Sequence, residues 1–500
     1  MPVVKFLKSG NRLVVDTADQ AVINKLTPLL CYTALKFLYG EDRKIRGRSM
    51  EYVPMQCYML DVKHRIGTSW GLYHRLTVAL AAMGYTVEII DLAPHLDPSV
   101  FEPYWDRLYD GSFDLRHRQD EFLIKMLSRP CGRFDCPTGY GKTMLIGLLA
   151  TILPKAVIHV VADSVPVLRD RMLPELCGML PDVGLFGGGS RQSGRRVQLY
   201  TVDSLRHSDF KADILIGDEC QQLAPNFSAS MLARYNSTRN YGLSATHDMR
   251  LDNKDLRVEA MFGPLIMSVS YQEAEAHGMV VPIEVRWHNV EMSSDPCTSE
   301  DPVWRKKQAV WRNHTRNEVI AGVAGSCGDK AQVLIVCEVI EHVLALRKML
   351  PEFEIVYGEN GITPHDETYY RNHGMWPPGH AVMTRERRMA LTKAFERGTL
   401  RRAIVTTVWN VGVSFNKLQH LIRADAGASP INDTQIPGRV SRLADDKECG
   451  VIHDFTDTFN KTYTGRATGR ARNYHKHGWT QYSPDGKVYV PAGKAHDWNH

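Results

Sequence analysis

The chain has 500 residues, too many for a single hydrophobic core, so two to four domains are expected. Hydrophobic residues make up 43% and charged residues 23%, and no apolar run is long enough to span a bilayer, which favours a cytoplasmic protein over a membrane protein. The ten cysteines form no C-x-x-C pair and favour neither a paired zinc site nor a disulfide framework. The formal net charge is only +5, but the segment from Thr458 to His500 alone carries seven Lys/Arg against two Asp/Glu.

The first 110 residues predict a small α+β domain of their own. A strand is expected near Val3–Val15 and another at Thr86–Leu92, with helical stretches between them. A basic cluster lies in this part of the chain, and such a cluster suits phosphate contact, although a solvated surface is an equal alternative. The cluster consists of Arg43, Lys44, Arg46 and Arg48.

From about Leu115 onward, short apolar strands alternate with amphipathic helical stretches. This pattern predicts an α/β fold with parallel sheets covered by helices on both faces, in which ligands lie at the carboxyl ends of the strands. We expect two blocks, 111–285 and 286–456, joined by the polar segment Ser293–Glu300 and followed by a basic tail at 457–500. Residues 359–384, rich in Gly, Pro, His and aromatics, predict an insertion. The expected buried strands are Val157–Val161, Val197–Val202, Ile214–Ile216, Val333–Cys337, Ile404–Thr407 and Val451–Asp454.

The segment Pro137-Thr138-Gly139-Tyr140-Gly141-Lys142-Thr143 follows a predicted strand, Arg133–Cys136, and precedes a predicted helix, Met144–Leu153. This is the context of a phosphate-binding loop, in which glycines permit the turn and backbone N–H groups at a helix N-terminus face the phosphates. Lys142 is expected to reach the β- and γ-phosphates of ATP, and Thr143 to bind Mg²⁺. Cys136 stands where a strict phosphate loop has its first glycine, and a chance glycine turn is the alternative.

Two adjacent acids, Asp218 and Glu219, end the predicted strand Ala212–Gly217 and continue as Cys220-Gln221. Phosphoryl transfer to water needs one carboxylate to hold the metal ion and another to orient the nucleophile. We assign the metal to Asp218 and the water to Glu219. An acidic pair alone is usually a surface feature, but its distance from the phosphate loop favours catalysis.

A third segment reads Gln435-Ile436-Pro437-Gly438-Arg439-Val440-Ser441-Arg442. Arginines three residues apart share one face of a helix and can present guanidinium groups to a phosphate. In a two-lobe motor such arginines complete the site from the opposite lobe, so that hydrolysis is coupled to closure. A basic surface helix is the alternative, and it leaves the Gln and Gly at this spacing unexplained.

Together these segments resemble superfamily 2 helicases over roughly Leu115 to Asp457. The resemblance implies two tandem RecA-like motor lobes that use ATP and Mg²⁺. It implies that Gln119 contacts the adenine with Arg116 beside it, and that Gly412 helps to bind the nucleotide. The catalytic residues that it implies are Lys142, Asp218, Glu219, Gln435, Arg439 and Arg442.

The same resemblance implies contacts with nucleic acid. In the segment Tyr241–Thr246, the residues Ser244, Ala245 and Thr246 would couple the nucleotide state to the grip on nucleic acid. Backbone contacts are implied in the segments Ala162–Val167, Gly187–Gly189, Thr201–Ser204 and Cys337–Val339. The segment Thr406–Ser414 would touch both the nucleic-acid strand and the nucleotide. The individual contact residues are Ser164, Thr201, Asp203, Thr407, Trp409 and Asn410.

Details of these segments favour DNA over RNA. The acidic segment reads Asp-Glu-Cys-Gln and not the Asp-Glu-Ala-Asp of the RNA-remodelling branch, and Gln435 stands where that branch has His. Ser414 stands where many relatives carry Asp. Met249–Asp252 and Met261–Pro264 look closest to the phage UvsW and eukaryotic XPB group, whose members act on DNA forks, branches or duplexes with 3′-to-5′ polarity. The resemblance therefore implies a helicase or translocase that remodels branched or forked DNA, with residues 1–110 as an accessory DNA-binding domain.

Three alternatives remain: the translocase of a restriction, defence or repair complex; an RNA helicase; and a clamp that binds nucleic acid without hydrolysing ATP. The resemblance also allows other replication or recombination proteins as partners and is compatible with a monomer. Two hypotheses concern the less typical segments. The cluster Arg43–Arg48 and the arginines Arg466, Arg470 and Arg472 would grip duplex arms. In the insertion, Tyr369, Tyr370 and Trp376 would stack on bases at a junction, with a loop of no function as the alternative.

Overall fold

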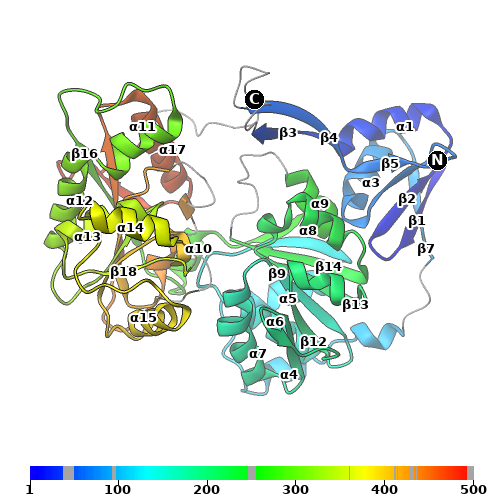
Figure 1. Ribbon diagram of the computed structural model, residues 1–500. Coiled ribbons are helices and arrows are strands. Elements are labelled where there is room, and N and C mark those ends of the chain that lie inside the picture. Colours follow the sequence, from blue (N-terminus) through cyan, green and yellow to red (C-terminus); the bar gives the residue numbers. More distant parts are fainter. Residues whose placement is uncertain are drawn as a thin grey trace. The chain divides into compact units, whose positions relative to one another are not determined.

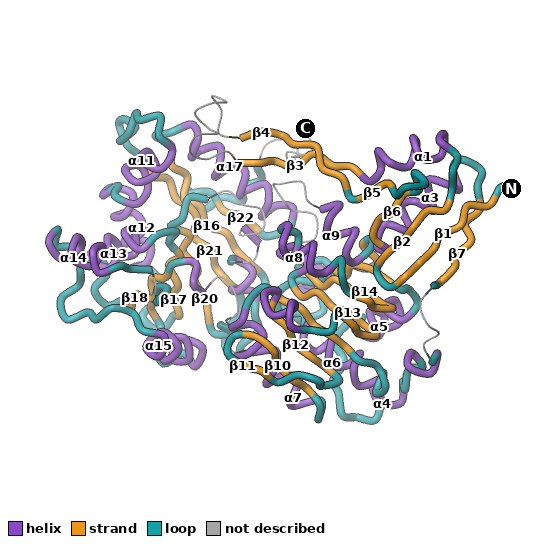
Figure 2. Tube along the Cα trace, turned by 45° about the vertical axis from the view of Figure 1, so that its right-hand side comes forward, coloured by secondary structure: helices purple, strands orange, loops and turns teal. Residues whose placement is uncertain are grey.

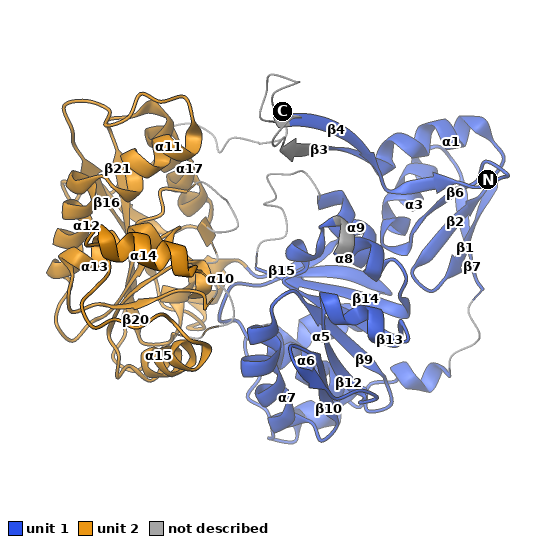
Figure 3. Cartoon of the chain, in the orientation of Figure 1, with its two compact units in different colours: residues 1–269, 499 blue, residues 270–498, 500 orange. Residues whose placement is uncertain are grey.

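The computed structural model describes residues 1–37, 50–92, 97–245, 255–359, 361–409, 413, 415–427, 433–434 and 436–491. The chain divides into two compact units, in the main residues 1–269 and 270–498 (Figure 3). No helix within the described ranges is both long and apolar enough to cross a membrane. The basic cluster Arg43–Arg48 lies outside the described residues, so its contact with DNA stays a prediction.

The first unit begins with a mixed five-stranded sheet of order β5-β6-β2-β1-β7 (Figure 1). The single strand expected near Val3–Val15 is a hairpin, because Gly10 turns the chain with a φ of +55° between β1 and β2. The parallel pairing of β1 with β7 gives the sheet its second edge, and α1 and α3 contribute buried residues to its core. The bounds are β1 Val3–Ser9, β2 Arg12–Asp16, α1 Gln20–Leu26, β5 Tyr58–Leu60, β6 Ile66–Ser69, α3 Tyr73–Ala82 and β7 Thr86–Asp91, with a separate two-stranded sheet of β3 Cys31–Phe37 and β4 Met50–Gln56.

This N-terminal sheet packs closely against the rest of the first unit. A Cβ added at Gly71 would lie 2.3 Å from the carbonyl oxygen of Glu259, so the backbones approach as closely as glycine permits. Arg75 donates to both carboxylate oxygens of Glu259 at 3.1 and 2.7 Å. Asn240 Nδ2 donates to Asn11 Oδ1 at 2.9 Å. Residues 1–92 therefore share polar and packing contacts with the larger sheet that follows.

The larger sheet of the first unit has the order β11-β10-β12-β9-β13-β14-β8-β15, and its strand pairs are parallel except for β10 with β11. Helices α6 and α7 contact each other, and α8 and α9 do the same on the other side of the strands (Figure 1). The strands predicted from apolar runs are confirmed. Their bounds are β8 Cys131–Asp135, β9 Ile158–Ala162, β10 Val183–Gly187, β11 Ser190–Arg191, β12 Val197–Thr201, β13 Lys211–Asp218, β14 Asn236–Ser244 and β15 Leu265–Ser268. The helices are α4 Asp106–Tyr109, α5 Gln119–Leu127, α6 Lys142–Ile152, α7 Leu173–Met179, α8 Asn226–Leu232 and α9 Asp255–Phe262.

The second unit contains an all-parallel sheet of order β18-β19-β17-β20-β21-β16-β22 (Figure 2). Helices α12 and α13 contribute to the core on one face, and α17 contacts β21 and β22. The strands are β16 Ile283–Val290, β17 Gln332–Val336, β18 Glu354–Val356, β19 Arg402–Val405, β20 Leu418–Arg423, β21 Gly450–Asp457 and β22 Thr480–Tyr482. The helices are α10 Tyr271–Ala276, α11 Pro302–Lys306, α12 His314–Ser326, α13 Ile340–Met349, α14 Pro364–Asn372, α15 Arg385–Arg397 and α17 Lys461–Lys476.

Three expectations about the later part of the chain differ from the structure. The boundary placed at 285 falls inside β16, and the supposed connector Ser293–Glu300 follows that strand within the second unit. The supposed tail at 457–500 includes α17 and β22, which belong to the second unit's fold. One of its basic side chains is buried: Arg470 is 2% exposed and pairs with Asp454 at 2.8 Å. Arg470 is therefore not a surface residue that could bind DNA.

The expected insertion at 359–384 contains α14, whose N-terminus is capped by Thr363 and Asp366. Trp376 is buried against the core of the second unit, and its indole Nε1 donates to the carbonyl of His380 at 2.9 Å. Tyr370 also packs against that core. These two rings are therefore not available for stacking on bases, and Tyr369, which is partly exposed, is the aromatic side chain that retains the proposed role.

Candidate active site

The phosphate-loop segment joins the end of β8 to the start of α6, as predicted. Gly139 and Gly141 adopt φ values of +97° and +104°, in the left-handed region that side chains disfavour, and this explains the glycines. Gly141 caps α6, which begins at Lys142. The backbone N–H groups of the first helical turn have no partner within the helix, so this terminus can receive an anion.

Arg116 and Gln119 lie against the same loop. Arg116 donates through Nη1 to the carbonyl of Gly139, and its backbone N–H donates to Gln119 Oε1 at 3.0 Å. Gln119 Nε2 donates to the carbonyl of Tyr140 at 3.4 Å, and a Cβ added at Gly141 would lie 3.2 Å from that nitrogen. The buried Tyr140 completes the network by donating to the carbonyl of His117 at 2.6 Å. Gln119 thus supports the loop through side-chain contacts that the sequence did not indicate.

The acidic pair lies at the carboxyl end of β13, one strand away from β8 across β14. Lys142 Nζ is 2.9 Å from Glu219 Oε1, so the loop and the acidic segment meet. Glu219 adopts a φ of +48°, which costs a side-chain-bearing residue roughly 1–2 kcal/mol. Left-handed strain of this kind occurs at functional sites, where the surrounding contacts hold it.

Burial and charge shift the pKa values of these three groups in different directions. Burial opposes the charge on Lys142, but the carboxylate of Glu219 outweighs it and raises the pKa of the lysine. Burial, and then the charge of Glu219, raises the pKa of Asp218. Burial acts against ionisation of Glu219 too, but the ammonium of Lys142 and the amide of Gln221 outweigh it and lower its pKa. Glu219 is therefore the ionised partner of Lys142, whereas at Asp218 burial and the charge of Glu219 outweigh the charges of Lys142 and Arg171.

The donor set at Asp218 fits a divalent metal ion. Asp218 is 5% exposed, and its Oδ1 is buried with no hydrogen-bond partner among the described residues. Such an atom is costly unless a cation or a donor occupies the space beside it. The hydroxyl of Thr143, in the first turn of α6, is also nearly buried. Thr143 and Asp218 would hold Mg²⁺, which would neutralise charge on the phosphates of a bound nucleotide.

The third strand of this edge, β14, ends at Ser244. The backbone N–H of Cys136 donates to the carbonyl of Ser244 at 2.9 Å, and Ser244 is paired with Asp135 across the two strands. A change at the phosphate loop would therefore reach Ser244 through one hydrogen bond. Ala245 follows it directly. Thr246 lies outside the described residues, so its part in coupling stays a prediction.

The segments predicted to contact nucleic acid come together at the carboxyl ends of β9, β10 and β12, which are parallel neighbours. Gly187, the last residue of β10, and the next two residues, Gly188 and Gly189, have φ values of +132°, +59° and +92°. A Cβ at Gly187 would lie 2.6 Å from Thr201 Oγ1, and one at Gly188 would lie 2.1 Å from Val165 Cγ1. Gly188 and Gly189 are exposed, so another backbone could approach them closely.

The predicted contact residues on this edge differ in exposure. Ser164 is half-buried and accepts a hydrogen bond from Leu168 through its carbonyl at 3.2 Å. Thr201 is buried, and its hydroxyl accepts from the N–H of Ser204 at 3.3 Å. Asp203 is exposed, and its negative charge makes it a poor direct partner for a phosphate. The structure thus brings these segments together. The exposed backbone at Gly188 and Gly189 is the part of this edge that another molecule could approach most closely.

In the second unit, Arg439 belongs to a short 3-10 helix, Pro437–Ser441, and Arg442 follows its end in an extended conformation. The prediction of two arginines on one face of an α-helix is therefore wrong. Both side chains are nearly buried, and Arg439 donates through Nη1 to the carbonyl of Val413 at 2.8 Å. Gln435, Asn410 and Gly412 lie outside the described residues, so their predicted roles are unchanged.

Trp409 ends a 3-10 helix, Thr407–Trp409, and is only 2% exposed. Its ring centroid lies 5.1 Å from that of Phe395 and 4.9 Å from that of Phe415, and its Nε1 donates to Thr392 Oγ1 at 2.9 Å. We therefore assign Trp409 to the core and no longer to the nucleic-acid surface. Thr407, two residues earlier, is exposed and keeps its predicted contact.

The sequence did not predict a role for Gln221, which contacts the acidic pair. Gln221 is fully buried and donates through Nε2 to Glu219 Oε2 at 2.8 Å, while Lys142 holds the other carboxylate oxygen. Glu219 is thus fixed from both sides. Its position could have suggested this contact, because Gln221 is the last residue of the Asp-Glu-Cys-Gln segment and lies two residues after Glu219.

No family model matches the chain. A curated relative, "Putative helicase 22" of Sulfolobus islandicus filamentous virus (isolate Iceland/Hveragerdi), is 25% identical over 266 residues. That match covers 50% of this chain and 44% of the relative, so less than half of the relative's length is represented.

Among solved structures, Dbp5 of S. cerevisiae, bound to RNA and ADP BeF3, is similar with a TM-score of 0.52 and 14% identity over 78% of this chain and 94% of that one. This likeness shows that the chain and Dbp5 share a fold. The solved structures that are similar also include T4 UvsW, with 15% identity and a TM-score of 0.42 over 97% of this chain and 99% of that one. The expected α/β class with two large, mainly parallel sheets is confirmed.

Proposed function

We propose that this chain is an ATP-dependent helicase or translocase that remodels branched or forked DNA. The observation that carries the proposal is the meeting of Lys142, Asp218 and Glu219 at one edge of the first unit's sheet. The glycine-lined loop and the N-terminus of α6 would hold the phosphates, with Lys142 neutralising their charge. Asp218 and Thr143 would hold Mg²⁺, and Glu219, fixed by Gln221, would orient the attacking water.

Completion of this site would come from Arg439 and Arg442. Their guanidinium groups suit a phosphate, and a contact made only in the transition state would couple hydrolysis to a conformational change. Alanine at either arginine is expected to lower ATP hydrolysis while leaving nucleotide binding nearly unchanged. The exposed Arg397 of α15 serves as the matched control. Normal hydrolysis in both variants would contradict the role.

The DNA track would run along the loops after β9, β10 and β12. The exposed Gly188 and Gly189 favour a partner recognised through its backbone, since a glycine offers backbone groups and no side chain to read a base. Binding of this kind is independent of sequence and weakens as salt rises. A side chain at Gly188 would both strain the backbone and collide with Val165. Gly188→Val is therefore expected to weaken DNA binding while leaving ATP hydrolysis without DNA unchanged.

The decisive experiment measures ATP hydrolysis and strand separation with purified full-length chain on forks, four-way junctions, tailed duplexes and RNA. We expect DNA-stimulated hydrolysis, with branched DNA unwound in preference to tailed duplexes, and loss of both activities in Lys142→Ala. Lys155→Ala removes an exposed lysine and is the control. Stimulation by RNA alone would identify an RNA helicase, and cleavage of the DNA would identify a restriction-type enzyme. Tight DNA binding without any hydrolysis would identify a clamp.

A further inference from the structure

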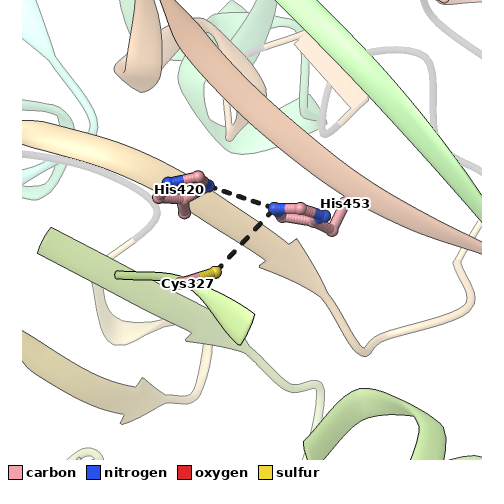
Figure 4. A group of neighbouring side chains, drawn as sticks. All are labelled: Cys327, His420 and His453. Carbon is pink, nitrogen blue, oxygen red and sulfur yellow. Dashed lines mark hydrogen bonds between the residues drawn. The ribbon is translucent and has the colours of Figure 1, made fainter. Parts of the chain in front are cut away.

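Three histidines and one cysteine gather on one face of the second unit's sheet, the face that α12 and α13 cover. His420 of β20, His453 of β21 and His288 of β16 come from adjacent strands, and their rings stack with centroids 5.3 Å apart. Cys327 directly follows α12. Figure 4 shows the side chains of Cys327, His420 and His453 pointing toward one another.

The donor atoms have the spacing of a metal site. His420 Nδ1 lies 3.1 Å from His453 Nε2, and Cys327 Sγ lies 4.0 Å from the same nitrogen. One atom from each of the three residues lies within 4.8 Å of the others. In tetrahedral zinc sites the metal lies about 2.0–2.1 Å from nitrogen and about 2.3 Å from sulfur, which places neighbouring donors about 3.3–3.6 Å apart. Small side-chain rotations would bring the three atoms to that spacing.

His288 supplies the support that metal-bound histidines commonly have. Its Nε2 lies 3.0 Å from His453 Nδ1. If His453 Nε2 gives its lone pair to a metal ion, Nδ1 carries the proton and donates it to His288. Cys327 and His453 are 3% and 4% exposed and so are shielded from competing water, whereas His420 is half-buried. A softer donor set of two imidazoles and a thiolate suits zinc better than Mg²⁺ or Ca²⁺.

A metal-free arrangement of the same side chains is also chemically complete. Neutral His288 can donate to His453, and His453 can donate to His420. In that case the thiol of Cys327 serves only the helix end, where it lies 3.4 Å from the carbonyl of Val323. The two arrangements differ in Cys327, which is a ligand in one and a bystander in the other.

We propose that Cys327, His420 and His453 bind one zinc ion, with His288 orienting His453. The ion would tie the segment after α12 to β20 and β21, and so stabilise the second unit from a position outside the phosphate loop's chemistry. It would leave a fourth position for water or another small ligand. The proposal is independent of the function proposed above, because none of these residues belongs to the candidate active site.

The test uses the full-length chain, stripped of metal with a chelator and then titrated with Zn²⁺ or Co²⁺. We expect one bound metal ion per chain, a rise in Tm with zinc, and a thiolate-to-cobalt charge-transfer absorption with cobalt. Cys327→Ser should abolish the charge-transfer absorption, and His420→Asn should lower the affinity at least tenfold. Cys177→Ser, which removes an exposed thiol, should leave both signals unchanged.

A measurement on the unaltered chain covers the case in which the variants fail to fold. Zinc should protect Cys327 from alkylation, as read by mass spectrometry of the digested protein, while the exposed Cys31 and Cys177 react at the same rate with and without zinc. Equal alkylation of Cys327 in both conditions would overturn the proposal. So would the absence of a charge-transfer absorption in the cobalt-loaded chain, since either result shows a sulfur that does not bind metal.

Discussion

Lys142 Nζ and Glu219 Oε1 form an ion pair of 2.9 Å between the start of α6 and the residue after β13. Both groups are assigned to phosphate chemistry, yet here each neutralises the other. A nucleotide that takes Lys142 for its phosphates must compete with Glu219, and it thereby frees the carboxylate to orient water. If the proposed function holds, the pair would link nucleotide binding to the freedom of Glu219 to orient water.

Replacing Glu219 with Gln tests this link. We expect ATP hydrolysis to fall by about 10²–10⁴, the usual contribution of a general base. Nucleotide affinity should rise, because Lys142 no longer has a carboxylate competing for it. Steady-state hydrolysis and equilibrium binding of a fluorescent ATP analogue measure the two effects. Glu175→Gln, an exposed carboxylate on α7, is the control, and weaker nucleotide binding in Glu219→Gln would contradict the competition.

The buried ion pair of Arg470 and Asp454 predicts a large loss of stability on truncation. Arg470→Ala leaves Asp454, which is fully buried, with Tyr474 as its remaining side-chain donor at 2.8 Å. Breaking such a pair costs about 3–5 kcal/mol. Arg466→Ala, on the same helix but partly exposed, should change the free energy of unfolding by less than about 0.5 kcal/mol. Urea unfolding of the two variants distinguishes a structural arginine from a surface one.

Replacing Gly71 with Ala tests how much the close packing between the N-terminal domain and α9 contributes to stability. In Gly71→Ala the new Cβ would collide with the backbone of Glu259 and Ala260, and neither can move without shifting α9. Overpacking of this kind costs about 1–3 kcal/mol. Gly178→Ala, in α7, meets no atom within 4 Å and should be neutral or stabilising by up to about 1 kcal/mol. Thermal unfolding of both variants tests the contrast, and equal Tm values would refute it.

His342 of α13 predicts a loss of stability in acid. Burial, and then the charge of Arg316, lowers its pKa from 6.5 to about 3. Above pH 6.5 the ring is neutral in both the folded and the unfolded chain. As the pH falls below 6.5 the unfolded chain takes up a proton that the folded chain refuses, so stability declines by up to about 1.4 kcal/mol per pH unit.

His342→Gln removes this contribution, at some general cost because Nε2 is 2.9 Å from Asn317 Oδ1. The difference in unfolding free energy between wild type and variant should therefore shrink between pH 6.5 and pH 5. His365→Gln, which removes an exposed histidine of α14, is the control. A difference that stays constant over this range would argue against a neutral buried ring.

The candidate active site was largely predictable because its segments are local. The phosphate loop is formed by consecutive residues, Pro137–Thr143, between one strand and the next helix. Residues that are neighbours in the sequence are therefore also neighbours in space. Asp218 and Glu219 could be placed because carboxyl ends of parallel strands meet at one edge. Gln119 and Gln221 were harder, since their contacts depend on side-chain directions that periodicity does not encode.

Burial of polar and aromatic side chains was the main source of error. Arg470, Trp376 and Trp409 were read as surface residues because arginine and tryptophan commonly contact nucleic acid. Each instead is buried inside the second unit, where Arg470 pairs with Asp454. The metal site proposed at Cys327 could not be predicted from the sequence, because the other two ligands, His420 and His453, lie 93 and 126 residues further on.

The strand order of the second sheet has a consequence for synthesis on the ribosome. The larger sheet of the first unit is complete once Ser268 has been made, whereas β16 must wait for β21 and for β22, which ends at Tyr482. At about 5–20 residues per second, the interval between these two points is roughly 10–40 s. For most of that time, from the synthesis of Val290 until β22 is complete, the nascent chain would carry β16 with at least one unpaired edge and half of its side chains apolar. Chaperone engagement during translation is therefore expected for the second unit and not for the first.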